Sequence, residues 1–144
     1  MKYLLSIAFI LLLYSCSGGF EHSYKKFDDL NKANLRLRSW FPSLIGQDCY
    51  NLKEVHTIGE IESYGRFSYK NELRIDSLLS DSTNYETILK DTLIKFLEKF
   101  KEVKRPGWFL GKDELQNKAL YRHESTYFIK DALDKTIYFA YTAK

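Results

Sequence analysis

The chain has 144 residues and a formal net charge of only +3 at neutral pH. So small an imbalance gives no electrostatic reason to expect a nucleic-acid partner. Aromatic residues make up 16% of the sequence, a share that argues against a disordered chain. Length and composition therefore indicate one folded domain with a hydrophobic core of its own.

The N-terminal segment has the composition of a secretory signal. Met1-Lys2 give a short positive start, an apolar run follows over Tyr3–Tyr14, and the small residue Ser15 precedes Cys16. The run is shorter than the roughly 20 apolar residues that a membrane-spanning helix needs, but it suits the apolar part of an export signal. The pattern predicts that residues 1–15 are a signal peptide, expected to form an N-terminal signal helix.

The ending Leu13-Tyr14-Ser15-Cys16 resembles the lipobox of bacterial lipoproteins, in which the cysteine is lipidated and becomes the new N-terminus. The resemblance implies lipidation at Cys16 and a lipid bilayer as partner, because two or more acyl chains hold a protein stably at a membrane. It also implies a location in the cell envelope, on the outer membrane facing the periplasm, since Ser17 rather than Asp follows the cysteine. The alternative is an ordinary cleaved signal in which Cys16 lies near the cut by chance.

Beyond the signal, the sequence predicts a tether and then one domain. Residues 16–22 comprise the lipidated cysteine and a flexible tether, because Ser17-Gly18-Gly19 allow the backbone many conformations. Residues 23–144 are expected to form a single α+β domain. Cys49 is the one cysteine left once Cys16 is lipidated, so an intramolecular disulfide is excluded in the mature chain.

The first predicted elements are a helix and a hairpin. Apolar residues at helical spacing predict a helix over about 24–36, and Pro42 follows where a helix has to have ended. Loose alternation over 50–58 and 61–70 predicts two strands that form a β-hairpin. Within the second strand, Gly65 marks either a bulge or a close approach of another group. The next segment, 71–79, suits either a short helix or irregular structure.

The longest predicted helix spans about 84–104. Asp81-Ser82-Thr83 offer N-cap oxygens, and Glu86 stands three residues after Thr83, as in a capping box. Apolar residues recur every three or four positions along this segment, which is typical of a helix that packs on a core. They are Tyr85, Ile88, Leu89, Leu93, Phe96, Leu97 and Phe100. We expect the helix to cover one face of a sheet and to bury Leu93, Phe96 and Phe100.

The C-terminal part is rich in β-branched and aromatic residues. Segments 126–130 and 136–141 predict a second hairpin, and 119–123 is a candidate for a neighbouring strand. Together the elements predict an α+β fold: a single small domain with an antiparallel sheet of four to five strands, one long helix and one shorter helix, after the signal helix.

Three groups of residues between Tyr24 and Tyr69 follow a spaced pattern. They are Tyr24, Phe27 and Asp29; Arg38, Trp40, Phe41 and Pro42; and Asn51, Leu52, Glu54, His56, Gly65, Phe67 and Tyr69. The pattern resembles that of an uncharacterised family of small bacterial proteins, many of them secreted or lipid-anchored. The resemblance implies a shared small α+β fold and no known activity. Cys49 stands where that family has a small residue, which implies a buried thiol that packs as a small hydrophobe.

Glu54 and His56 are the strongest candidates for chemistry, because alternate residues of a strand share one side. An imidazole beside a carboxylate can act as acid, base or metal ligand. Metal sites usually need three or four protein ligands, however, and His22 and His123 show no supporting spacing. We therefore expect the pair to be structural, with no catalytic residue, no metal and no cofactor.

Two classes of function remain. The first is a non-catalytic binding or accessory module of the envelope, which recognises an envelope protein through an exposed apolar patch. The alternative is a small hydrolase or metal-dependent enzyme built around Glu54, His56 and Arg66. The sequence contains no recognisable nucleophile or dinucleotide motif, which favours the binding module. Its candidate binding residues are Glu54, His56, Arg66, Trp40 and Trp108.

Overall fold

The computed structural model describes residues 19–33, 41–57, 59 and 61–143. The expected signal peptide, the lipidation site Cys16 and the candidate binding residue Trp40 lie outside these ranges. Within them, no helix is both long enough and apolar enough to cross a membrane.

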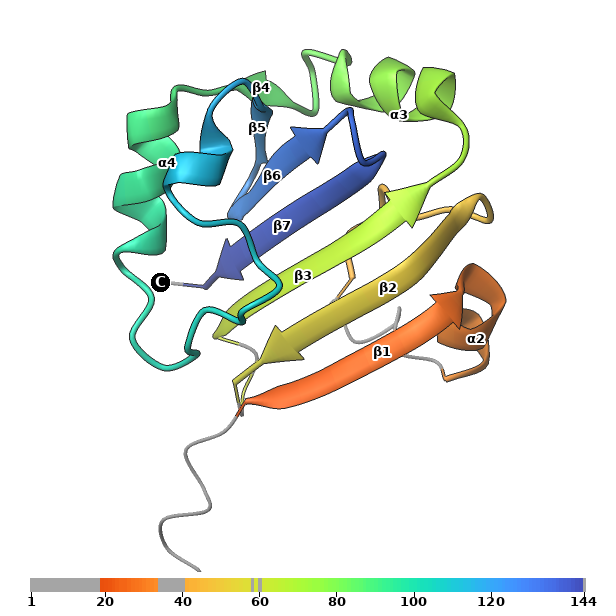
Figure 1. Cartoon of the computed structure of the whole chain (residues 1–144), viewed down its shortest axis with the longest axis horizontal. Coiled ribbons are helices and arrows are strands. Elements are labelled where there is room, and N and C mark those ends of the chain that lie inside the picture. Colours follow the sequence, from red (N-terminus) through yellow and green to blue (C-terminus); the bar gives the residue numbers. More distant parts are fainter. Residues whose placement is uncertain (1–18, 34–40, 58, 60, 144) are drawn as a thin grey trace, which may run out of the picture.

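Over the described ranges, seven strands form one antiparallel sheet in the order β1-β2-β3-β7-β6-β5-β4 (Figure 1). The strands are β1 (Phe20–Lys26), β2 (Cys49–His56), β3 (Glu62–Tyr69), β4 (Glu86–Thr87), β5 (Ala119–His123), β6 (Thr126–Asp131) and β7 (Thr136–Thr142). The helical elements are α2 (Phe27–Lys32), α3 (Glu72–Leu79), α4 (Lys90–Leu97) and the 3₁₀ helix η2 (Asp113–Leu115).

Two hairpins make up the centre of the sheet. Strands β2 and β3 pair on either side of a turn in which Gly59 adopts a φ of 88°, and β6 pairs with β7. Pairing of β3 with β7 then joins the two hairpins edge to edge. Both hairpins that the sequence predicted are confirmed, as is the strand at 119–123. These predictions succeeded because alternating β-branched and aromatic residues favour strand formation locally.

Alternation along the strands produces a hydrophobic cluster on each face of the sheet. The face that carries Phe67 and Phe139 packs against α3 and residues 41–49, and we call it the Phe139 face. The opposite face carries Tyr64, Tyr138 and Ala140, and we call it the Tyr138 face. Helix α4 and the segment that follows it cover the Tyr138 face (Figure 1). The sheet is therefore covered on both sides, not on one.

The expected fold class is wrong. In the described part of the chain the sheet has seven strands rather than four to five, and no α-helix exceeds eight residues. Most of the difference lies in the helix expected over 84–104. Its first part forms β4, which pairs with β5, and only Lys90–Leu97 are helical.

Two carboxylates explain why the longer helix does not form. At its expected start, Asp81 Oδ1 accepts hydrogen bonds from the Thr83 N–H at 3.0 Å and from Thr83 Oγ1 at 2.6 Å. Asp81 therefore closes a local turn instead of capping a helix. At the expected end, the Glu62 carboxylate accepts the N–H groups of residues 101–103, which a continued helix would have bonded internally.

The helix expected over 24–36 is also shorter than predicted. Residues up to Lys26 form β1, whose side chains alternate against β2, and α2 spans only Phe27–Lys32. Strand β1 begins at Phe20, within the range expected for the tether. The apolar residues Phe27 and Leu30 are buried as helical spacing predicts.

Candidate functional site

Glu54 and His56 form a buried pair on β2. His56 Nδ1 lies 2.9 Å and 3.1 Å from the two carboxylate oxygens of Glu54. The exposed fraction is 0% for Glu54 and 4% for His56. A hydrogen bond to the imidazole compensates a carboxylate that burial would otherwise destabilise. The structure thus brings together the two residues that strand alternation singled out.

His22 completes a cluster with this pair. In the β1–β2 register His22 lies directly opposite Glu54, and its ring stacks on His56 with centroids 5.4 Å apart and planes 11° apart. One ligand atom from each of the three residues lies within 4.8 Å of the others. Two imidazoles and a carboxylate are donors that zinc and related transition metals accept.

The apolar surroundings of the cluster come from Gly65 and Phe139. Gly65 lies opposite Glu54 in the β2–β3 register and opposite Phe139 in the β3–β7 register. A Cβ atom at position 65 would lie only 1.9 Å from Phe139 Cζ, so glycine is required for this ring to pack on the strand. Of the two alternatives predicted at Gly65, a bulge or a close approach, the structure shows the close approach, and it places an aromatic wall beside the carboxylate.

Arg66 does not belong to this cluster. In the sheet register it pairs with Lys53 and Tyr138, so its side chain projects from the Tyr138 face, opposite to Glu54. Its guanidinium carbon lies 5.6 Å from the centroid of the Trp108 ring, in the geometry of a cation–π contact. The sheet therefore separates the candidate residues Arg66 and Trp108 from Glu54 and His56.

A groove of about 590 Å³ opens on the Tyr138 face beside α4. Its floor is apolar and consists of Tyr64, Ile94, Leu97, Phe100, Val103, Leu110 and Leu115. Its rim is charged and consists of Lys101, Lys104, Arg105, Lys112, Glu98 and Glu102. Because Lys112 Nζ lies 2.8 Å from Glu98 Oε1, that pair is internally neutralised, and the rest of the rim keeps an excess of positive charge.

The Glu62 carboxylate holds the loop that lines one side of this groove. It accepts backbone hydrogen bonds from Lys101 at 3.1 Å, Glu102 at 2.8 Å and Val103 at 3.1 Å. Burial of Glu62, which is 1% exposed, makes these bonds strong because little water competes for them. The loop that carries the cationic rim is thereby fixed to the start of β3.

Tyr64 contributes a neutral hydroxyl to the groove. Burial raises its pKa to about 12, an effect that Glu62 reinforces and Arg105 opposes. The Tyr64 ring packs against Phe100 and Phe109, with centroids 4.7 Å apart in each case. The floor of the groove is therefore rigid and uncharged at neutral pH.

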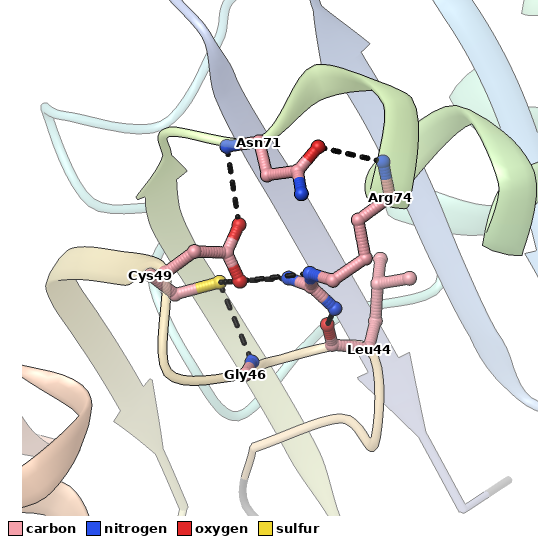
Figure 2. Close-up of polar contacts among 6 residues, drawn as sticks. Leu44, Gly46, Cys49, Asn71 and Arg74 are labelled. Atoms are coloured by element: carbon pink, nitrogen blue, oxygen red, sulfur yellow. Dashed lines mark hydrogen bonds and ion pairs between the residues drawn. The ribbon is translucent and has the colours of Figure 1, made fainter.

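Cys49 lies in a separate polar cluster at the other end of the Phe139 face (Figure 2). Its sulfur accepts hydrogen bonds from Arg74 Nη2 at 3.3 Å and from the Gly46 N–H at 3.4 Å. Burial raises the pKa of the thiol, although these two bonds oppose the shift, and Asp48 adds to it. The expected burial of Cys49 is confirmed, and at neutral pH its thiol is protonated.

Arg74 ties this cluster together. Its guanidinium lies 2.7 Å from Asp48 Oδ1 through Nε and donates to the Leu44 carbonyl at 3.1 Å through Nη1. The Asn71 N–H donates to Asp48 Oδ2 at 3.3 Å, and Asn71 Oδ1 caps α3 (Figure 2). The contacts join α3 to the loop before β2, so the cluster has a structural role.

Sequence reasoning set His22 aside and missed Glu62. The signal for His22 was the alternation of Phe20, His22 and Tyr24, which predicts a strand and hence a partner across it. The signal for Glu62 was its place two residues before Tyr64, because residues two apart in a strand share a face. Both contacts depend on which segment pairs with which, and local spacing does not report that.

Residues 18–68 match the family model of the YbbD head domain, which is a small bacterial family. The match runs from just before β1 to nearly the end of β3 and contains all three residues of the His22–Glu54–His56 cluster. It overlaps the stretch in which the sequence resembled a small bacterial family, and that resemblance is confirmed at this level. Comparisons with curated proteins and with solved structures find no match.

Proposed function

We propose that this protein is a lipid-anchored binding module of the bacterial cell envelope. In this proposal the groove on the Tyr138 face holds a segment of an envelope protein that combines apolar side chains with acidic ones. The observation that carries the proposal is the pairing of an apolar floor with a cationic rim in one groove of about 590 Å³.

The chemistry of the groove defines the partner. Apolar side chains of the partner gain by leaving water for the floor between Ile94, Leu97 and Leu115. Lys101, Lys104 and Arg105 at the rim then favour carboxylates next to those apolar residues, and they steer the partner as it approaches. Because Glu62 fixes the loop before any partner arrives, little conformational entropy is lost on binding.

The anchor part of the proposal rests on the sequence of the first sixteen residues. The apolar run and the ending Leu13-Tyr14-Ser15-Cys16 support export and lipidation, and the match to a bacterial family agrees with a bacterial envelope. Metabolic labelling with an alkyne fatty acid tests it. We expect label on the wild-type chain and none on Cys16→Ser, and equal labelling of both chains would refute the anchor.

Photo-crosslinking in the producing cells tests the binding module. With benzoylphenylalanine in place of Ile94, we expect a discrete protein adduct whose crosslinked segment, identified by mass spectrometry, is acidic and apolar. Benzoylphenylalanine in place of Leu73, which is exposed on α3, is the position control and should give no such adduct.

Two charge-reversal double variants distinguish binding at the cationic rim from non-specific adhesion of other proteins. Lys104→Glu with Arg105→Glu should abolish the adduct at position 94. Lys25→Glu with Lys26→Glu changes the net charge equally at the exposed end of β1 and should leave the adduct intact. An adduct that survives the first pair, or that contains only lipid, would contradict an acidic protein partner.

A further inference from the structure

We propose that His22, Glu54 and His56 form a binding site for a zinc-like divalent transition metal. The proposal is independent of the groove, because the cluster lies on the Phe139 face and shares no residue with it. The expectation of no metal, drawn from the sequence, rested on ligand number alone. Register between β1 and β2 supplies the third ligand that local spacing could not show.

The first step of the argument is the donor set. Two imidazole nitrogens and one carboxylate oxygen suit zinc and its neighbours, whereas Mg²⁺ and Ca²⁺ prefer sites made of oxygen alone. Three protein ligands leave one position of a tetrahedral ion for water. The cluster therefore selects for transition metals by the chemistry of its atoms.

The second step is geometry. Ligand atoms of a tetrahedral zinc ion with bonds near 2.1 Å lie about 3.4 Å from one another. The Glu54–His56 contact, at 2.9–3.1 Å, is already close to that separation. All three ligand atoms lie within 4.8 Å of one another, so His22 needs to approach by at most about 1.4 Å. A half-buried side chain covers that distance by a change of rotamer.

The third step is support from the fold. Glu54 and His56 project from β2, which is paired on both sides, and His22 projects from the adjacent β1. Ligands on paired strands stay aligned, which reduces the ordering cost of binding an ion. Phe20, whose ring centroid lies 5.7 Å from that of His56, and Phe139 provide apolar walls that strengthen metal–ligand attraction.

Binding also defines a proton arrangement. In the described pair, His56 Nδ1 and the Glu54 carboxylate face each other and share a hydrogen bond. An ion placed between them uses the Nδ1 lone pair, so the imidazole proton resides on Nε2. His22 is partly exposed, and the ion enters from its side of the cluster.

Titration of the full-length chain in detergent with Co²⁺ tests the proposal, because Co²⁺ occupies zinc sites and gives visible absorption bands. We expect one Co²⁺ per chain, with the bands lost on addition of Zn²⁺. His22→Gln should weaken binding by more than the ten- to hundredfold that supporting residues of metal sites typically cost. His22 is half-buried on an edge strand, so this variant should fold, and circular dichroism verifies that it does.

His123→Gln is the matched control. His123 lies on β5 at the far side of the sheet, where its Nδ1 contacts the Asn84 carbonyl at 2.5 Å. The control should bind Co²⁺ like the wild type. A chain that binds no Co²⁺ with one-to-one stoichiometry, or a His22→Gln variant that binds as tightly as the wild type, would overturn the proposal.

Discussion

Two buried carboxylates lie on opposite faces of the sheet, and the fold holds them in different ways. Glu62, on the Tyr138 face, accepts backbone N–H groups from three consecutive residues of one loop. Glu54, on the Phe139 face, contacts the imidazole of His56 and lies opposite His22. Both are at most 1% exposed, so burial alone does not distinguish them.

Glu62 and Glu54 differ in whether their hydrogen-bond partners can be replaced by a ligand. Backbone N–H groups are permanent donors, so the Glu62 contacts fix the loop and with it the rim of the groove. An imidazole offers a lone pair or a proton at each nitrogen, so the contacts of Glu54 can pass to a metal ion. Glu62 thus holds the rim of the groove in place, whereas Glu54 is suited to bind a metal ion.

The largest expected effect tests the aromatic packing of α4 on the Tyr138 face, the face that also carries Glu62. Phe96 stacks on Tyr127 with centroids 3.8 Å apart and is buried on the Tyr138 face. Phe96→Ala should lower the free energy of unfolding by about 3–5 kcal/mol, because it leaves a cavity. Urea denaturation measures the loss. Leu89→Ala, at an exposed position of the same sequence stripe, should change it by less than about 0.5 kcal/mol.

A loss below about 1 kcal/mol for Phe96→Ala would mean that α4 does not pack on the sheet as described. The groove would then lack a rigid wall, and the contrast between the two faces would disappear.

The next effect tests Glu62 directly. Glu62→Gln should lower the free energy of unfolding by about 2–3 kcal/mol, because a neutral amide accepts the three N–H groups less well than a carboxylate. Hydrogen exchange of residues 101–103 should accelerate in the same variant. Unchanged exchange would show that the loop holds its shape without Glu62.

A smaller effect is expected at the other carboxylate. His56→Gln should lower the free energy of unfolding by no more than about 1 kcal/mol, since the glutamine amide can still donate to Glu54. The variant should remain folded while losing the proposed metal site. If His56→Gln destabilises the chain more than Glu62→Gln does, the assignment of one carboxylate to structure and the other to binding is reversed.

The sequence predicted what depends on neighbours along the chain. Both central hairpins followed from alternating residues, and Leu93 and Phe96 are buried as their helical spacing indicated. The long helix does not form because two contacts override helix propensity: β4 pairs with β5, and Glu62 accepts hydrogen bonds from backbone N–H groups 39 to 41 residues further along the chain. Propensity and periodicity contain no information on such partners.

The candidate site shows the same division. Glu54 and His56 were identified because they are two residues apart in one strand, and the structure pairs them. His22 was set aside because its link to Glu54 passes through strand register, and Arg66 was included although register places it on the opposite face. A site assembled across strands becomes visible only once the order of strands is known.

The smallest expected effect concerns the buried thiol of Cys49, which accepts hydrogen bonds from one backbone donor and one side-chain donor. Burial raises the pKa of the folded thiol above its value in the unfolded chain, while the bonds from Gly46 and Arg74 oppose that shift. A raised pKa favours the folded state while the thiol is protonated, so this stabilisation is complete below the unfolded pKa. This stabilisation is lost as pH rises through the folded pKa.

Urea denaturation at pH 7 and pH 10 should therefore show a larger fall in the free energy of unfolding for the wild type than for Cys49→Ala. Comparison of the two chains removes the contribution of the tyrosines, which titrate in both. An equal fall in the two chains would mean that the donors offset burial completely, and Cys49 would then resemble Glu62 as a group whose charge the backbone accepts.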